Sequence, residues 1–350
     1  MKSVISSVLL LLLGAMAAFL TVWPSDPFTN RLADDVEQEG LGERIIIKFS
    51  HVVAENTPKG LAAEKFAQLA YEKTDGRVEV QVYPNSILYS DHNEMDALMQ
   101  NEIQMIAPAF SKVATLDSSW LLLDLPFAFL DQQSVDKAFA GGIGKTLFAT
   151  LKAHGLKGMA FWSNGFKQMT SSRNPLITPE DFAGQRFRIM SSDVLKAQFQ
   201  VLQASASPIA FNEVYRNIEA GSIDGQENTA SNIFTKRLFI GQKYMTISNH
   251  GYLGYAVMVN QSFWESLPPD IQQKLEEAMA EATAWNRRQA TEMNAQQLAY
   301  LTERANLQVH VLTPDERLRW QEAFRPVYAR FTPIIGEELM DQLKQLQEQR

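Results

Sequence analysis

Arg188 is the charged residue of this sequence whose surroundings are hardest to explain by solubility. It lies in the segment 187–190, whose apolar residues are typical of a buried strand, and Arg186 falls on the same face by strand alternation. A buried guanidinium requires a partner, and its planar fork can hold a carboxylate through two parallel hydrogen bonds. Arg188 therefore indicates either a carboxylate-binding site or an internal ion pair with an Asp or Glu.

Lys59 is a second cation in an unusual context. It follows Pro58 in the first turn of a helix for which Thr57 is the expected N-cap. The free N–H groups at a helix N-terminus attract anions, whereas a lysine at that end opposes the helix dipole. Because helix stability alone would not select Lys59 there, we interpret it as a candidate for anion binding, with an exposed helix lysine as the alternative.

Asn228 and Phe211 occupy positions suited to lining a ligand cleft. Asn228 follows a turn that contains Gly225, and its amide could donate to a ligand carboxylate or hydroxyl. Phe211 ends an apolar segment at 208–211, and strand ends line the crevice of open α/β sheets. An ordinary capping role for Asn228 remains open.

An alternation of strand and helix patterns from Arg44 onward is expected to position these side chains. Asp91 and Asn212 are expected to cap helices, and a very long helical pattern runs from Pro268 to about Arg304. This order predicts an α/β fold with largely parallel sheets flanked by helices. Strands are predicted at 45–49, 78–82, 103–107, 157–162, 187–190, 207–210, 250–259 and 307–312, and further helices at 134–154 and 193–203.

Composition and spacing argue against several functional classes. A length of 350 residues suggests two domains, and a net charge of −8 argues against nucleic acid as a partner. The sequence has no cysteine, and its five histidines form no close ligand pair, so neither a thiolate nor a metal centre is expected. The segment 141–146 resembles a phosphate loop but has Phe139 where that loop needs its first glycine. We therefore expect no cofactor, no metal and no enzymatic activity.

The N-terminus resembles an export signal. Residues 1–23 contain a single charge, at Lys2, and an apolar run, and the segment 15–17 fits a small-residue cleavage site. An uncleaved membrane anchor is the alternative, since about 20 apolar residues can span a bilayer. Residues 24–43 are polar and acidic and are expected to form a flexible leader. Both interpretations place the folded part outside the cytoplasm.

The sequence resembles the solute-binding proteins of TRAP transporters, and in particular their dicarboxylate-binding branch. The resemblance covers about residues 44–335, and many short motifs match in order. The matching segments are HVVAENTPKG at 51–60, VYPNS at 82–86, DLPF at 124–127, NGFKQ at 164–168, RFRIMSS at 186–192, FNEVY at 211–215 and DGQEN at 224–228.

This resemblance implies the periplasmic-binding-protein fold. In that fold two α/β domains enclose a ligand cleft and are joined by hinge strands and by a long helix spanning both, which the pattern from Pro268 resembles. We expect the domains to comprise residues 44–165 with 254–293, and residues 166–253 with 294–350.

The resemblance also implies roles for five residues. Arg188 matches the family's carboxylate-binding arginine, and Asn228 and Phe211 match its cleft asparagine and phenylalanine. Lys167 matches a basic cleft position that is arginine in sialic-acid binders, so a point charge replaces a fork. Lys59 is expected to serve the distal carboxylate of a diacid.

Together these expectations describe an exported, periplasmic and monomeric binding protein. It would capture a four-carbon dicarboxylate such as succinate, fumarate or malate, with Arg188 and Lys167 on one domain and Lys59 on the other. A ligand that touches both domains favours closure, and the closed form would dock on TRAP membrane permease subunits. Two alternatives remain open, namely another organic acid as ligand, such as a 2-oxo acid or sugar acid, and a role as ligand presenter for a membrane sensor.

Overall fold

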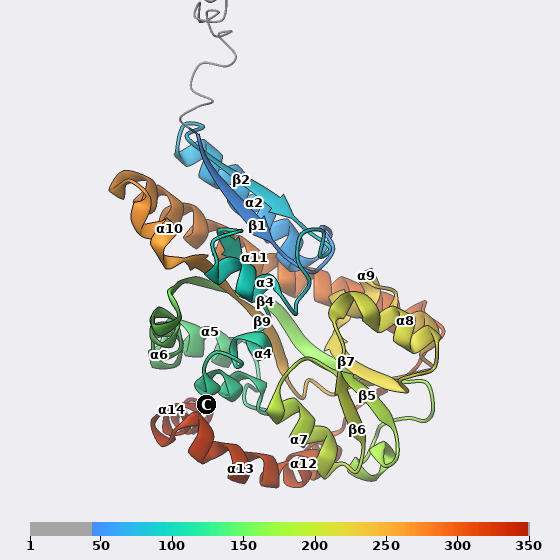
Figure 1. Cartoon of the computed structure of the whole chain (residues 1–350). Helices are drawn as coiled ribbons and strands as arrows, with labels where there is room; N and C mark the ends of the chain where they lie inside the picture. The colour runs from blue at the N-terminus through green and yellow to red at the C-terminus, as the bar shows by residue number, and fades with distance from the viewer. Residues whose placement is uncertain (1–43, 349–350) are drawn as a thin grey trace, which may run out of the picture. The chain divides into compact units, whose positions relative to one another are not determined.

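The computed structural model describes residues 44–348, so the predicted export signal at 1–23 and leader at 24–43 lie outside the described residues. A ten-stranded mixed sheet forms the centre of this part, in two sections that share the long strand β4 (Leu156–Ser171) (Figure 1). Helices pack around both sections, and none of those between residues 44 and 348 has the length and apolar content needed to cross a membrane.

The first section orders its strands β2-β1-β3-β9-β4. Strand β1 (Ile45–Ser50) pairs in parallel with β2 (Val78–Tyr83) and with the short β3 (Met105–Ile106). Strand β9 (Tyr252–Asn260) runs antiparallel to both β3 and β4. The predicted parallel pairing is therefore found at the edge of the sheet, formed by β1, β2 and β3, while the strands at its centre are antiparallel.

The second section uses the end of β4, from Lys167 onward. This part pairs in antiparallel fashion with β7 (Gly225–Thr229) and with β8 (Tyr244–Ile247). Strand β5 (Arg186–Ile189) lies in parallel between β7 and β6 (Ser205–Pro208), and β8 pairs in parallel with β10 (Gln308–Val311).

Strand β4 changes its partner at one peptide bond. Phe166 pairs with Tyr252 of β9, whereas Lys167 pairs with Thr229 of β7. The register shifts just before this point, at Gly165. Its backbone φ of 140° is a value that residues other than glycine rarely adopt. The change of partner lies one residue beyond the predicted domain boundary at 165/166, and the domain limits themselves stay a prediction.

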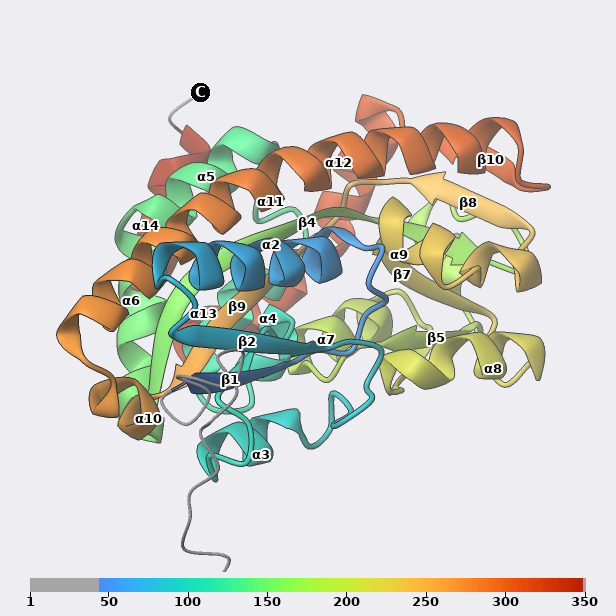
Figure 2. The same ribbon diagram turned by 90° about the horizontal axis from the view of Figure 1, so that it is seen from above.

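The long helix predicted from Pro268 to about Arg304 is helix α11 (Pro269–Glu303), so this prediction is confirmed. Figure 2 shows α11 running alongside α2 (Pro58–Lys73) and continuing past α9 (Ala230–Thr235). Its first half contributes to the core of the first section, and Leu301 near its end belongs to a core beside the second section. At 35 residues, it has a length of about 50 Å.

The apolar positions gather into three clusters within the described residues. One lies between β1, β2, α2 and the start of α11, with Phe49, Phe66 and Trp162 buried at its centre. A second extends from Trp120 to the C-terminal helices, and a third surrounds Phe211.

The remaining helices are α3 (Glu94–Met99), α4 (Phe110–Val113), α5 (Gln132–Ala140), α6 (Gly142–Leu151), α7 (Asp193–Val201), α8 (Val214–Glu219), α10 (Gln261–Ser266), α12 (Pro314–Ala323), α13 (Arg325–Ile335) and α14 (Glu337–Glu348), with 3₁₀ helices η3 (Ser118–Asp124), η4 (Lys152–His154), η5 (Pro179–Phe182), η6 (Phe211–Glu213) and η7 (Leu238–Gly241).

Several local predictions differ from the structure, among them the strand end predicted at Phe211, which is the first residue of the 3₁₀ helix η6. Asn93, not Asp91, precedes α3, and α8 begins after Glu213 with no side-chain cap, so the capping roles of Asp91 and Asn212 were wrong. The prediction of largely parallel sheets was wrong at the centre, because β4 and β9 connect the two sections as antiparallel neighbours. Strand β4 extends well beyond the predicted 157–162. Its second half is polar and nevertheless buried, because its polar side chains form hydrogen bonds with neighbouring segments.

Candidate ligand-binding site

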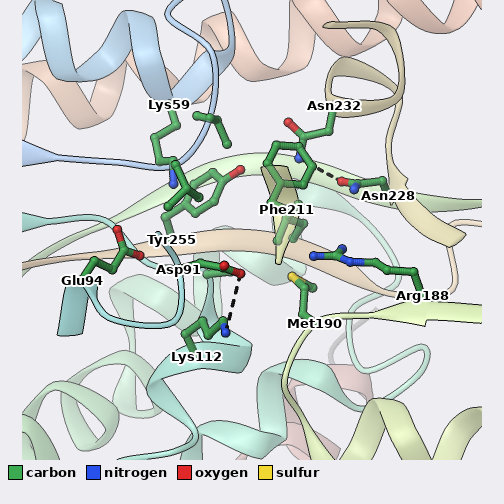
Figure 3. A pocket seen from close by; sticks show the side chains of 14 residues that line it. Lys59, Asp91, Glu94, Lys112, Arg188, Met190, Phe211, Asn228, Asn232 and Tyr255 are labelled. Atoms are coloured by element: carbon green, nitrogen blue, oxygen red, sulfur yellow. Dashed lines mark hydrogen bonds and ion pairs between the residues drawn. The ribbon is translucent and has the colours of Figure 1, made fainter. Parts of the chain in front are cut away.

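A partly enclosed cavity lies between the two sections of the sheet. Figure 3 shows Lys59 and Arg188 entering it from opposite sides, with Phe211 between them. Four of the five residues predicted to bind ligand line this cavity, namely Lys59, Arg188, Phe211 and Asn228. The other lining residues are Val52, Val53, Asp91, Glu94, Ala109, Lys112, Met190, Asn232, Leu253 and Tyr255.

Lys59 is placed by the start of α2. The Thr57 side chain accepts a hydrogen bond from the Gly60 N–H, as an N-cap does, and Pro58 is the first helical residue. A Cβ atom on Gly60 would lie 2.4 Å from the Ala54 carbonyl oxygen, so only glycine lets the helix start this close to the preceding loop. The motif at 57–60 therefore directs Lys59 inward.

The Lys59 ammonium is fully buried. It donates to the Ala107 carbonyl oxygen at 2.9 Å and lies 4.0 Å from the centre of the Tyr255 ring. Burial lowers the pKa of Lys59 to about 8, although Glu94 and Asp91 oppose that shift. No Asp or Glu between residues 44 and 348 lies within ion-pair distance of Lys59.

Arg188 faces the same cavity from β5, with an exposed fraction of 2%. Its Nε–H donates to the Ile209 carbonyl oxygen at 2.9 Å, and its guanidinium carbon lies 5.9 Å from the centre of the Phe211 ring. Burial lowers the pKa of Arg188 to about 10, against the attraction of Asp91 and Glu227. In the part of the chain that the structure describes, Arg188 forms no ion pair, so the internal ion pair considered from the sequence is absent there.

Asn228 is oriented by its neighbours. Its side-chain oxygen accepts from the Asn232 amide at 2.8 Å and from the Thr229 N–H at 3.1 Å. The Asn228 amide group has no hydrogen-bond acceptor among the described residues and remains a donor at the cavity wall.

A group of acidic and basic residues that the sequence did not single out completes the cavity. Lys112 of α4 lies 3.5 Å from an Asp91 carboxylate oxygen and also donates to the Ser191 hydroxyl at 3.1 Å. Glu94, the first residue of α3, is buried beside them. Asp91 had been interpreted as a helix cap, and nothing in its spacing from Lys112 indicates their contact, which depends on how α3 and α4 pack.

Lys167 does not line the cavity. Its Nζ lies 2.6 Å from an oxygen of Glu227, and the two side chains have exposed fractions of 2% and 1%. The register explains this placement, because Lys167 pairs with Thr229, two residues from Glu227 on one strand face. Arg188 pairs with Gln226, which lies on the opposite face together with Asn228.

Lys167 is one member of a buried group that we call the Glu227 cluster, formed by Lys167, Gln198, Glu227, Ser248 and His250. The second Glu227 oxygen lies 2.8 Å from His250 Nε2, and His250 Nδ1 lies 2.7 Å from the Ser248 hydroxyl. Burial alone would raise the pKa of Glu227, but Lys167 and His250 outweigh it and lower the value to about 2. The charge of Lys167 is therefore neutralised within the protein.

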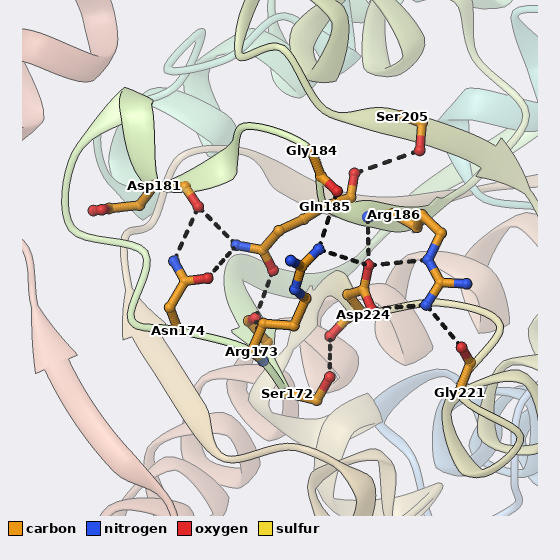
Figure 4. Close-up of polar contacts among 11 residues, drawn as sticks. Ser172, Arg173, Asn174, Asp181, Gly184, Gln185, Arg186, Ser205, Gly221 and Asp224 are labelled. Carbon is orange, nitrogen blue, oxygen red and sulfur yellow. Dashed lines mark hydrogen bonds and ion pairs between the residues drawn. The ribbon is translucent and has the colours of Figure 1, made fainter.

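Arg186, predicted to share a face with Arg188, has a different environment. Figure 4 shows its guanidinium against Asp224, with hydrogen bonds of 3.0 and 2.8 Å to the two carboxylate oxygens. A third bond of 2.8 Å reaches the Gly221 carbonyl oxygen. Arg186 is about half exposed, so this fork stabilises the end of β5 at the surface.

The cavity has the chemistry of an anion site. Two buried cations without a carboxylate partner lie on opposite walls, with an amide donor and an aromatic ring between them. Between residues 44 and 348 no group of three or more histidine or acidic side chains is arranged to hold a metal ion. A ligand that offers an anionic group to each wall would satisfy both cations.

Comparison with known proteins agrees with this geometry. The chain is 44% identical to the C4-dicarboxylate-binding protein DctB of Bacillus subtilis over 99% of each chain. It is 45% identical to the C4-dicarboxylate-binding periplasmic protein DctP of Rhodobacter capsulatus, over 87% of this chain and 91% of that one. A TRAP periplasmic solute-binding protein of Sulfurospirillum deleyianum, solved with bound succinate, superimposes with a TM-score of 0.82 at 41% identity, over 85% of this chain and 98% of that one.

The match to the family covers most of the chain that the structure describes. Residues 49–333 match the DctP family, described as bacterial extracellular solute-binding protein, family 7. The resemblance to TRAP solute-binding proteins inferred from the sequence is thereby confirmed, as is the α/β fold with its long helix. The chain belongs to the DctP family of bacterial extracellular solute-binding proteins.

Proposed function

We propose that this protein captures a four-carbon dicarboxylate outside the cytoplasmic membrane and delivers it to a TRAP-type membrane permease. The observation that carries the proposal is the pair of buried cations, Lys59 and Arg188, on opposite walls of one cavity. Burying a charge without a counter-charge is costly, so each cation requires an anionic partner. A diacid supplies one carboxylate to each wall.

The roles of the lining residues follow from their groups. Arg188 offers its two terminal nitrogens as a fork to one carboxylate, while its Nε is held by Ile209. Lys59 provides a point charge for the other carboxylate, and the Asn228 amide donates to an oxygen between them. Phe211 excludes water from the Arg188 side, which strengthens the ion pair. Lys167, whose charge is matched by Glu227, has no part in this proposal.

The proposed cycle needs no chemistry on the ligand. Lys59 lies on α2, which packs against the first section of the sheet, and Arg188 lies on β5 of the second, so a ligand that contacts both favours the closed arrangement. The partner change of β4 at residues 166 and 167 is the proposed hinge. In this proposal the protein acts as a periplasmic monomer, and the closed form is the one that the permease receives.

Thermal unfolding with a panel of acids tests the ligand class. Succinate, fumarate or malate should raise the melting temperature, because a ligand at about 1,000 times its Kd stabilises the folded state by roughly 4 kcal/mol. Butyrate, which has the same carbon chain and one carboxylate, serves as the matched control and should leave it unchanged. A shift with a sugar acid or a 2-oxo monoacid and none with any dicarboxylate would overturn the proposal.

A further inference from the structure

Glu94 is a buried carboxyl group in the cavity with no hydrogen-bond partner. Its exposed fraction is 2%, and neither of its carboxyl oxygens has a donor within reach among the described residues. A buried polar group without a partner costs several kcal/mol, and an ionised one costs more. A carboxyl group in this position therefore requires either a proton or a cation.

The cations near Glu94 already have other contacts. Lys59 of α2 donates to Ala107, and Lys112 of α4 pairs with Asp91, which precedes α3. Strand β9 contributes Tyr255 to the same wall, and β3 carries no titratable residue. Burial raises the pKa of Glu94 to about 7, with Asp91 adding to the shift and Lys59 and Lys112 opposing it.

The charges of the cavity wall favour the protonated form once a dianion is present. The cationic lining residues are Lys59, Lys112 and Arg188, and the acidic ones are Asp91 and Glu94. With Glu94 neutral, three positive charges and one negative charge leave +2, which matches the −2 of a dicarboxylate. With Glu94 ionised the wall carries only +1. The Glu94 carboxylate and a carboxylate of the ligand then repel each other in a medium of low dielectric constant.

We propose that Glu94 is protonated in the ligand-bound cavity and donates a hydrogen bond to the carboxylate held by Lys59, so that the protein takes up a proton together with the dicarboxylate. This inference rests on the proposed function. The proton comes from solvent, no covalent bond of the ligand changes, and Glu94 is a positioning and specificity residue that distinguishes a dianion from a monoanion. Affinity is therefore expected to fall as the pH rises above 7.

Isothermal titration with succinate in two buffers of different ionisation enthalpy, MOPS and imidazole at pH 7, measures the number of protons bound. A group with a pKa near 7 that becomes fully protonated takes up roughly half a proton or more per ligand. Lys59, with a pKa near 8, adds only about a tenth of a proton. Glu94→Gln keeps a hydrogen-bond donor and removes the titration of this group, so proton uptake should be smaller in the variant, and the remainder is carried by Lys59, whose pKa Glu94 otherwise raises.

The pH dependence of Kd gives a second reading. Between pH 7 and pH 8 wild-type affinity should fall about tenfold, with both Glu94 and Lys59 contributing, and Glu94→Gln should lose less affinity than the wild type over this range. The exposed residue Glu219 provides a matched control, and Glu219→Gln should behave as the wild type does.

The outcomes separate this inference from the proposed function. Succinate binding without buffer-dependent heat in the wild type overturns the protonation of Glu94 and leaves the proposed function intact. Uptake that is unchanged in Glu94→Gln also overturns it, because another group then carries the proton. If no dicarboxylate binds at any pH, the charge-matching argument and the proposed function are both wrong.

Discussion

The cavity and the Glu227 cluster bury lysines equally deeply but treat their charges in opposite ways. In the cluster, Lys167 and His250 each lie against a Glu227 oxygen, so every charge has a counter-charge within the protein. In the cavity, Lys59 and Arg188 donate to backbone carbonyl oxygens and have no carboxylate partner within residues 44–348. Burial alone therefore does not mark a candidate binding residue, whereas burial without an internal counter-charge does.

The largest expected effect concerns the Glu227 cluster. Glu227→Gln leaves Lys167 buried without a counter-charge, so the free energy of unfolding should fall by about 3–5 kcal/mol. Urea denaturation of the unliganded protein measures this loss. Glu94→Gln is the matched control in the cavity and should cost far less, because neither Glu94 oxygen has a hydrogen-bond partner among the described residues. Equal losses in the two variants would remove the distinction between the two regions.

Arg188→Met tests the cavity side of the comparison. Methionine fills much of the same volume without burying a charge, so unliganded stability should be unchanged or higher. Succinate affinity should fall by about 2–5 kcal/mol, or roughly 30-fold to several-thousand-fold, because the ligand loses its fork. Titration calorimetry beside urea denaturation separates the two quantities. Near-normal affinity with a large loss of stability would mean that Arg188 stabilises the fold and does not bind the ligand.

Acid should affect the two regions in different pH windows. His51 is buried near Lys59, and burial together with the charge of Lys59 lowers its pKa to about 3, against a weaker opposing effect of the Val53 backbone. The unfolded chain binds a proton there below about pH 6.5 and the folded chain does not, so stability falls by up to about 1.4 kcal/mol per pH unit from 6.5 towards 3. The stability that Glu227 contributes is present above about pH 4.5 and is lost only as the pH falls towards 2.

The measurement is urea denaturation of the wild type and His51→Met at pH 7, 6 and 5. The variant should lose less stability than the wild type across this range, because one of the titrating groups is gone. Parallel curves for the two proteins would mean that His51 is protonated in the folded state.

The smallest effect is expected at Arg186. Its ion pair with Asp224 lies at the surface, and Arg173 provides Asp224 with a second cation at 3.8 Å. Arg186→Met should lower the melting temperature by about a degree or two and leave succinate affinity unchanged. It is the matched control for Arg188→Met two positions along the same strand. A loss of affinity comparable to that of Arg188→Met would show that Arg186 also acts on the ligand.

Local patterns in the sequence were sufficient for much of the framework. The N-cap at Thr57 and the extent of α11 depend on neighbouring residues, and the structure agrees with both, while for Lys59 it decides between the two alternatives that the sequence left open. Burial of Arg188 also followed from the apolar residues beside it. The partner of Arg188 did not follow, since an ion pair and an open carboxylate site require the same local sequence.

Contacts between distant segments were decided by the tertiary structure. Lys167 resembles a cleft residue in its motif, but the register between β4 and β7 turns it to the face opposite Arg188, where Glu227 neutralises it. Asp91, Glu94 and Lys112 meet in the cavity because α3 and α4 pack beside Lys59, and no short-range pattern encodes that contact.

The sequence by itself determined most of the strands and helices, the burial of Arg188 and the family to which the chain belongs, because those properties depend on local patterns and on motifs in order. Only the tertiary structure decided which buried cation remains without a counter-charge. That property depends on strand register and on the packing of segments that lie far apart in the chain, where a shift of one residue turns a side chain to the other face.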